Sequence, residues 1–353
     1  MRILIAGGAG FVGSSLCLNF RKSLPGAAIV AFDNLRRRGS ERNLAIFKEH
    51  NIQFVHGDVR SADDIQGCGA GFDLFVDASA EPSVLAGQDG SPAYVLDTNL
   101  KGTLNCLEYA RKSCGQFLFL STSRVYSIDP LRAISLDENK TRFVVGAAEQ
   151  GGLSQEGVAE TFPTHLPRSL YGATKLASEM FVQEYVNTYG MKAIINRCGV
   201  IAGPGQFGKV DQGVFTLWVA RHFLGEPLKY TGFGGTGKQV RDLLHPADLF
   251  ALVKAQLDKP SQWNGSVFNI GGGNFCSTSL LELTKICEEV TGNTVKFSSS
   301  PETNPVDIPF YISDCRQARA AFDWQPKSDV RKIVTDIYVW LKSIGPEARQ
   351  LFG

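Results

Sequence analysis

The chain has 353 residues, of which 43% are hydrophobic and 20% are charged, and its formal net charge is +1. This length allows one large domain or two closely joined ones with a sizeable core. The balanced charge gives no reason to expect nucleic acid or a membrane as a partner, and no apolar run approaches the about 20 residues that span a bilayer. Eight scattered cysteines without a CxxC pair and five dispersed histidines indicate neither disulfides nor a metal site, so we expect a reducing cytoplasm and no metal.

The first 33 residues predict a dinucleotide site. An apolar strand from Arg2 to Ala6 leads into a turn with glycines spaced as GxGxxG, and a helix and a second apolar strand follow. Glycines let the backbone approach a pyrophosphate closely, and the helix then presents free N–H groups to the phosphates. The apolar stretch is too short to be a signal peptide. The contacts expected in this turn are with Gly7, Gly10, Phe11, Val12 and Gly13.

The second strand ends in Asp33, which predicts the identity of the coenzyme. It stands twenty residues beyond Gly13, where a carboxylate can accept hydrogen bonds from the adenosine ribose. An acid there would repel a 2′-phosphate, so we predict NAD rather than NADP, with Asn34 as a neighbouring contact. The arginines 36–38 follow closely and could bind such a phosphate, but we interpret them as a solvated basic turn.

Strands and helices alternate along the rest of the first half. The expected strands are 52–55, 72–77, 117–120 and 193–197, and the long expected helices are 94–113 and 171–189. This alternation predicts an α/β fold with a Rossmann-type, doubly wound parallel sheet. We assign residues 1–197 to it, with 243–270 returning to it. Residues 198–242 and 271–345 are expected to form a smaller mixed α/β domain that binds the substrate.

Ligands of such sheets bind at the carboxyl ends of the strands. Asp58 follows the third strand, where it could reach the adenine amino group or, equally, cap the next helix. Asn99, a polar residue beside an apolar helix face, is also expected to contact the cofactor. Further cofactor contacts are expected from Val59 and from the small residues Ala78, Ser79 and Ala80, while Thr122 and Ser123 after the fifth strand are placed for substrate.

Residues 127–169 do not continue the alternation of strands and helices, because they are rich in Gly, Glu, Ser and Pro and show little periodicity. A loop of this length in a compact domain is usually functional or disordered. We expect a partly ordered flap beside the site.

Tyr171 and Lys175 are one helical turn apart, so their side chains lie on the same face of a helix. A phenol with its usual pKa of about 10 is too weakly acidic to serve as a base at neutral pH. The lysine ammonium and a positively charged nicotinamide would both favour the phenolate. Tyr171 could then take a proton from a substrate hydroxyl while the carbon beneath gives hydride to NAD, with Thr122 bonded to the same oxygen.

This combination resembles the extended short-chain dehydrogenase/reductase family, which includes the nucleotide-sugar epimerases and dehydratases. The resemblance runs from Gly7 to about Pro326. It implies that Thr122, Tyr171 and Lys175 are catalytic and that the substrate is a nucleotide-diphosphate sugar. It also implies that Arg241 binds the diphosphate, the alternative being a surface salt bridge with Asp242. Further expected substrate contacts are Ser123, Arg124, Gln206 and Gln239, with Lys238 a weaker candidate.

Two departures from the family pattern narrow the reaction, and a third position matches relatives less well. The 4,6-dehydratases carry an acid after the catalytic Thr, but this chain has Ser123 and Arg124, so dehydration is not expected. Residues 200–202 read Val-Ile-Ala where relatives often have Asn-Val-Tyr, which argues against a generic 4-epimerase. Asp77 stands where relatives have His.

Several segments look closest to family members that epimerise CDP-activated sugars at carbon 2. These segments are 33–39, 54–60, 140–143, 206–207, 211–213, 237–245 and 268–272. The implied reaction oxidises carbon 2 transiently, turns the keto sugar over while the nucleotide stays anchored, and returns hydride to the opposite face. NAD would then remain bound throughout.

Three other functions stay open at this point. A UDP-hexose 4-epimerase would use the same Thr, Tyr and Lys; a reductase would consume NADPH; a non-catalytic sensor would need only the dinucleotide fold. Relatives pair through the helices equivalent to 94–113 and 171–189, so we expect a homodimer or homotetramer.

Overall fold

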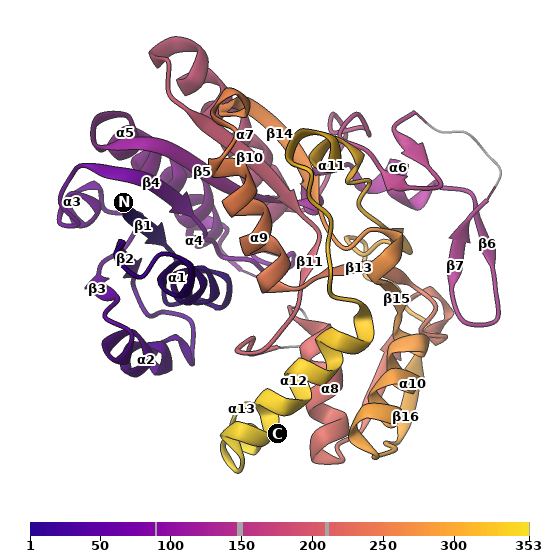
Figure 1. Cartoon of the computed structure of the whole chain (residues 1–353). Helices are drawn as coiled ribbons and strands as arrows, with labels where there is room; N and C mark the ends of the chain where they lie inside the picture. Colours follow the sequence, from indigo (N-terminus) through magenta and orange to yellow (C-terminus); the bar gives the residue numbers. More distant parts are fainter. Residues whose placement is uncertain (89, 147–150, 209–211, 353) are drawn as a thin grey trace.

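The computed structural model describes residues 1–88, 90–146, 151–208 and 212–352 (Figure 1). A seven-stranded parallel sheet, in the order β14-β10-β5-β4-β1-β2-β3, forms its N-terminal part. The strands are β1 (Arg2–Ala6), β2 (Ala28–Asp33), β3 (Gln53–His56), β4 (Phe72–Asp77), β5 (Cys114–Thr122), β10 (Ala193–Cys198) and β14 (Asn264–Ile270). The predicted Rossmann-type fold is confirmed. Since the strand order reverses between β1 and β4, a ligand crevice opens at their carboxyl ends.

Helices cover both faces of this sheet. The helices α1 (Phe11–Ser23), α9 (Pro246–Leu257) and α11 (Arg316–Phe322) share one apolar core, in which Phe20, Leu249 and Phe322 are buried. On the other face, α3 (Ala62–Gln66), α5 (Gly102–Ser113) and α7 (Leu170–Tyr189) bury Ile65, Leu107 and Val182. Short α2 (Asn43–Glu49) packs Phe47 into the first core. Burial on both faces explains why the strands are almost continuously apolar.

The helix expected over 94–113 has an irregular start. It consists of α4 (Ala93–Leu96), a π turn (Asp97–Lys101) and α5. A π turn inserts a residue into the helical repeat, which an apolar periodicity does not reveal. Here it buries Asn99 completely.

The C-terminal helices gather at the opposite end of the molecule from the sheet (Figure 1). They are α8 (Val214–Leu224), α10 (Leu280–Thr291), α12 (Val330–Ile344) and α13 (Glu347–Phe352), and they surround a second core containing Trp218, Leu283 and Ile337. The strands nearby are β11 (Val200–Ile201), β12 (Leu228–Thr231), β13 (Val240–Leu244), β15 (Ser277–Ser279), β16 (Phe297–Ser300) and β17 (Phe310–Tyr311).

One stretch packs differently from the predicted division of the chain. Cys315, Ala318, Phe322 and Trp324 belong to the core of the large sheet, although we assigned 271–345 to the substrate domain. The Trp324 indole donates to the Asp248 carbonyl of α9 at 3.0 Å. This α11 segment therefore returns to the sheet, as 243–270 does. The exact domain boundaries stay a prediction.

The described part of the 127–169 flap is folded rather than irregular. It contains α6 (Ile128–Arg132), the hairpin β6 (Leu136–Glu138) and β7 (Phe143–Val145), and the short pair β8 (Leu153–Ser154) and β9 (Gly157–Val158). Arg142 in the β6–β7 turn pairs with Glu282 of α10 at 2.6 Å, and the Ser279 hydroxyl donates to the Thr141 carbonyl at 2.7 Å. The hairpin is therefore docked on the C-terminal domain, and segment 140–143 holds it there.

Within the described ranges, no helix is both long enough and apolar enough to cross a bilayer.

Candidate active site

A cavity of about 630 Å³ opens where the sheet ends and reaches across to the C-terminal domain. Most of the predicted site residues line it. On the coenzyme side these are Gly7, Gly10, Phe11, Val12, Gly13, Asp33, Asn34, Val59, Ala78, Ser79 and Ala80. At the reacting end they are Thr122, Ser123, Arg124, Tyr171, Lys175 and Gln206. Asp58, Asn99, Gln239 and Arg241 do not line it.

The glycine turn leaves no room for side chains. A Cβ atom at Gly13 would lie 2.1 Å from the Gly7 carbonyl oxygen, and one at Gly7, whose φ is +69°, would lie 2.7 Å from the Ala78 carbonyl oxygen. Gly10 is the N-cap of α1, so the first N–H groups of that helix have no intrahelical partner, and this end of the helix lines the cavity. This bare backbone cradle fits the diphosphate of a dinucleotide.

Asp33 fixes the shape of the turn, and its expected contact with a ribose stays a prediction. Its two oxygens accept from the Ala9 amide at 3.1 Å and from the Leu35 amide at 2.7 Å. Burial raises the pKa of Asp33, and these backbone donors oppose that rise. Asn43, which we did not predict, also lines the cavity and donates to the Ala9 carbonyl at 2.8 Å. Its only sequence signal is a polar residue opening the helix after Asp33.

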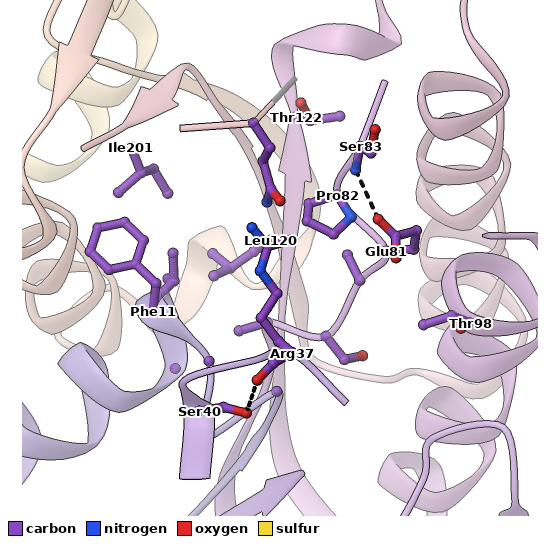
Figure 2. A pocket seen from close by; sticks show the side chains of 18 of the residues that line it. Phe11, Arg37, Ser40, Glu81, Pro82, Ser83, Thr98, Leu120, Thr122 and Ile201 are labelled. Carbon is purple, nitrogen blue, oxygen red and sulfur yellow. Dashed lines mark hydrogen bonds between the residues drawn. The ribbon is translucent and has the colours of Figure 1, made fainter. Parts of the chain in front are cut away.

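The arginines 36–38 are not simply a solvated turn. Arg36 and Arg38 are exposed and Arg37 is half-buried, but all three line the cavity. Figure 2 shows the Arg37 side chain extending into the pocket from the backbone beside Ser40. Arg36 stacks over the Tyr94 ring at 4.1 Å. The positive φ of Leu35, 56°, redirects the chain there, and periodicity could not foresee this turn.

Asp58 is already engaged by protein groups. Arg60 binds it at 2.7 Å, and the Asn34 amide donates to it at 2.8 Å. Burial alone would raise the pKa of Asp58, but these hydrogen bonds outweigh burial and lower that pKa to about 2. The alternative role as a helix cap is wrong, because the Ser61 hydroxyl caps α3 by accepting from the Asp64 amide.

Asn99 lies behind the cavity wall. Its side-chain oxygen accepts from the Glu81 amide at 2.7 Å, and its nitrogen donates to the Glu81 carbonyl at 3.1 Å and to the Thr174 hydroxyl at 3.3 Å. It therefore joins the loop after β4 to the helix that carries Tyr171. Its expected direct contact with the coenzyme stays a prediction.

The α7 helix brings the predicted catalytic residues Tyr171 and Lys175 to the cavity, close to Thr122. The Ser169 hydroxyl caps it by accepting from the Gly172 amide at 3.2 Å. A Cβ atom at Gly172 would lie 2.0 Å from the Arg124 carbonyl oxygen, so glycine allows α7 to pack directly on the backbone after β5. That contact places Tyr171 within hydrogen-bonding reach of Thr122. One turn further on, the Lys175 ammonium lies 4.0 Å from the centre of the Phe119 ring.

The expected low pKa of the tyrosine is not a property of the protein alone. Burial raises the pKa of Tyr171 to about 12, and the hydrogen bond with Thr122 and the charge of Arg124 only partly oppose the rise. Burial also lowers the pKa of Lys175, while Asp77 acts against that change. The cation of a bound nicotinamide would act in the opposite direction to burial and favour the phenolate of Tyr171.

The substrate side of the cavity holds fewer of the expected contacts. Arg241 is buried and pairs with Asp307 at 2.9 Å, so the alternative of a surface salt bridge with Asp242 is wrong. Burial lowers the pKa of Arg241 to about 10, Asp307 opposes this, and nearby Arg124 adds to it. The Gln239 amide donates to the Thr231 carbonyl at 3.1 Å. Their roles in substrate binding stay predictions.

Other residues noted from the sequence have definite places. Val200 and Ile201 line the cavity, while Lys238 pairs with Glu138 of the flap at 2.7 Å. Asp211, part of one segment noted above, lies outside the described residues. Across the described residues, no three His, Cys, Asp or Glu side chains gather as metal ligands.

Comparisons with known proteins agree with this geometry. A model of the NAD dependent epimerase/dehydratase family matches residues 3–271. A CDP-paratose 2-epimerase of Salmonella typhi is 31% identical over 98% of this chain and 100% of its own length. A dTDP-glucose 4,6-dehydratase of an Actinoplanes species is 27% identical over 97% of this chain and 98% of its own.

Two solved structures share the fold. A UDP-glucose 4-epimerase of Thermotoga maritima with UDP-glucose has a TM-score of 0.77 at 24% identity, covering 98% of this chain and 99% of its own. A dTDP-glucose 4,6-dehydratase of Bacillus anthracis in complex with NAD has a TM-score of 0.76 at 24% identity, covering 99% of each.

Proposed function

The chain belongs to the NAD-dependent epimerase/dehydratase family and its coenzyme is NAD, and from this premise we propose that it is a nucleotide-sugar 2-epimerase of the CDP-paratose type. The observation that carries the proposal is a complete Thr122, Tyr171 and Lys175 set beside Arg124, in one cavity. A basic residue in the turn where dehydratases hold an acid supports epimerisation over loss of water. The likeness to a CDP-paratose 2-epimerase along the whole chain supports the substrate.

In the proposed reaction the protein moves one proton twice. Tyr171 takes the proton from the hydroxyl on sugar carbon 2, and Thr122 holds the same oxygen by a hydrogen bond. Lys175 keeps positive charge near the phenolate. NAD, when bound, supplies reversible acceptance of hydride. After the keto sugar has turned over about its glycosyl–phosphate bonds, hydride would return to the opposite face of carbon 2 and Tyr171 returns the proton to its oxygen, so there is no net redox change.

The nucleotide must stay anchored while the sugar turns. Arg124 is the candidate anchor, because its side chain lines the cavity and adjoins Arg241. We propose that Arg241 assists by its charge from behind, since its guanidinium is held by Asp307 and the Ile308 carbonyl.

The test is to incubate the purified protein, with no added coenzyme, with CDP-paratose and in parallel with UDP-glucose. We expect the 2-epimer of the CDP sugar to form. Epimerisation of UDP-glucose alone would establish the 4-epimerase alternative instead, and a requirement for stoichiometric NADPH would establish a reductase.

We also propose that two copies of the chain pair through the outer face of α4 and α7. Apolar side chains are exposed there: Leu96, Met180, Phe181 and Tyr189 are 39%, 61%, 41% and 53% exposed. Such a patch on a chain of balanced charge is typical of a protein interface.

A further inference from the structure

Asp77 is a fully buried acid at the reacting end of the sheet, and nothing in the mechanism above uses it. It ends β4 and has no exposed surface. One carboxylate oxygen accepts from the Ser79 amide at 3.1 Å and from the Ser79 hydroxyl at 2.6 Å. The other accepts from the Thr103 hydroxyl at 3.0 Å. None of these donors is charged, so its negative charge lacks a direct partner among them.

Lys175, in the same region, is a buried ammonium that lacks a negative partner in the described part of the chain. It is 2% exposed, and no salt bridge joins it to a carboxylate among the described residues. Its ammonium lies over the ring of Phe119, which is the register partner of Asp77 in the neighbouring strand. A buried ammonium without a countercharge tends to lose its proton.

Hydroxyl groups of α5 and α7, near Asp77 and Lys175, contact the same Asn99 carbonyl. The Thr103 hydroxyl of α5 lies 2.9 Å from the Asn99 carbonyl, and the Ser178 hydroxyl of α7 donates to the same carbonyl at 3.0 Å. Thr103 contacts Asp77, and Ser178 lies three residues from Lys175 on the same helix. The strand pairing and these contacts around the Asn99 carbonyl place Asp77 and Lys175 on neighbouring elements of one buried region.

The other charged or titratable groups that face Lys175 are poor countercharges. Glu179 of α7 is held by Arg197 at 2.7 Å. The thiols of Cys106 on α5 and Cys198 on β10 are protonated at neutral pH, since burial raises the pKa of Cys106 well above its usual value and that of Cys198 to about 12.

We propose that Asp77 is a positioning residue for the reaction: its charge keeps Lys175 protonated at the buried site, while its oxygens hold the turn 78–80 against the coenzyme. The effect on turnover rests on the proposed function, but the effect on Lys175 does not. Without the negative charge, Lys175 would lose its proton at lower pH. The alkaline limb of the pH–rate profile would then move to lower pH.

The variant is Asp77→Asn, which keeps the shape and an acceptor for Ser79 but removes the charge. Thr103→Val is the matched control, because it removes a hydrogen bond to Asp77 and leaves the charge. The measurement is the NMR titration of the Lys175 side chain in ¹³C-lysine-labelled NAD-loaded protein, assigned with Lys175→Met. We expect the midpoint to fall by about one pH unit or more in Asp77→Asn, with little change in Thr103→Val.

An unchanged midpoint in Asp77→Asn, or an equal fall in Thr103→Val, would overturn the proposal. If Asp77→Asn does not fold, Asp77→Ser must show the same fall and Asp77→Glu must stay near the parent. The pH–rate profile is measured in parallel with the CDP sugar. Because the NMR titration needs no substrate, absence of epimerisation would count against the proposed function and leave the result on Asp77 intact.

Discussion

At Tyr171, burial and charge act on one proton in opposite directions. Burial raises the pKa of the phenol to about 12, whereas Thr122 and Arg124 lower it. Without NAD the phenol therefore keeps its proton at neutral pH. A nicotinamide cation in the cavity would lower the pKa, so base strength would develop only in the loaded protein.

Replacing Tyr171 by Phe removes the base while leaving the ring. We expect turnover to fall by roughly 10²–10⁴-fold, the usual contribution of a positioned acid or base, with bound NAD unchanged. Tyr185→Phe, a partly exposed tyrosine on the same helix, is the control and should keep full turnover. Turnover is followed as formation of the epimer, and bound NAD is measured after denaturation. Near-normal turnover in Tyr171→Phe would refute the role of the base.

The predicted site residues that line the cavity share a local signal. The glycine turn, Asp33, and the four-residue spacing of Tyr171 and Lys175 are each readable within one strand–turn–helix stretch, and all of them line the cavity. Asn43 was not predicted, and Arg37 was interpreted as part of a solvated turn, because the turns that bring both residues to the cavity depend on contacts of Asp33 and Ala9. Arg241 carries a family signal, yet its ion pair with Asp307 joins a strand to a loop that is 66 residues further along the chain.

Among the elements, β13 contains a carboxylic acid, Asp242, whose side chain is fully buried. It accepts from the Gly273 amide at 3.1 Å. Burial raises the pKa of Asp242 to about 6, and hydrogen bonds from Ser313 and Gly273 oppose the rise. The folded protein thus holds this proton more tightly than the unfolded chain. Since the folded state binds more protons, stability falls as pH rises from about 4 to about 6 and stays lower above that.

Asp242→Asn removes the titration and keeps the shape. We expect the free energy of unfolding at pH 7 to rise by about 1–3 kcal/mol, from a shift of about two pKa units. The pH dependence between about 4 and 6 should flatten. Urea unfolding across that pH range measures both effects, with exposed Asp258→Asn as the control. A parallel, undiminished pH dependence in Asp242→Asn would show that another group titrates.

Whether a segment forms a helix or a strand was easier to predict than its local irregularities and its long-range contacts. The strands of the large sheet follow from apolar runs alternating with helical periods, and the parallel order follows from that alternation. The sequence pattern did not predict the π turn at Asp97–Lys101 or the flap hairpin. The first depends on an inserted residue within an otherwise regular helix. The second is held by Arg142 and Glu282, which are 140 residues apart.

At the scale of the whole molecule, the outer face of α7 exposes apolar side chains that a second copy of the chain could cover. Phe181, Tyr185 and Tyr189 follow one another at four-residue spacing on this helix, and Met180 beside them is 61% exposed. If two copies pair through this face as proposed, we expect Phe181→Glu to give a monomer, because a charge buried in an apolar interface is costly. Sedimentation velocity measures the change. Val339→Glu, at a residue of α12 that is 58% exposed, should leave the assembly unchanged. A dimeric Phe181→Glu would place the interface elsewhere.

The two halves of the molecule meet over the coenzyme side of the cavity, through the loop that follows Asp33. Arg42 pairs with Glu347 of α13 at 2.6 Å, and Arg37 donates to the Phe207 carbonyl at 3.4 Å. Gly39 lies against the Phe207 ring, so closely that a Cβ atom there would come within 2.4 Å of it. This loop therefore touches the C-terminal domain while it lines the coenzyme end of the cavity, which is how a resident NAD could be retained between turnovers.

Gly39→Ala should loosen this contact and release NAD. Gly39 has a φ of +94°, so alanine is strained there and its methyl group also pushes Phe207 away. Gly225→Ala is the matched control: its φ is +72°, but nothing lies within 4 Å of the added Cβ. Both variants carry a backbone strain of about 1 kcal/mol, and only Gly39→Ala disturbs the domain contact. The NAD retained after gel filtration should therefore fall in Gly39→Ala alone. Equal retention in the two variants would mean that the glycine turn and Asp33 hold the coenzyme without help from the second domain.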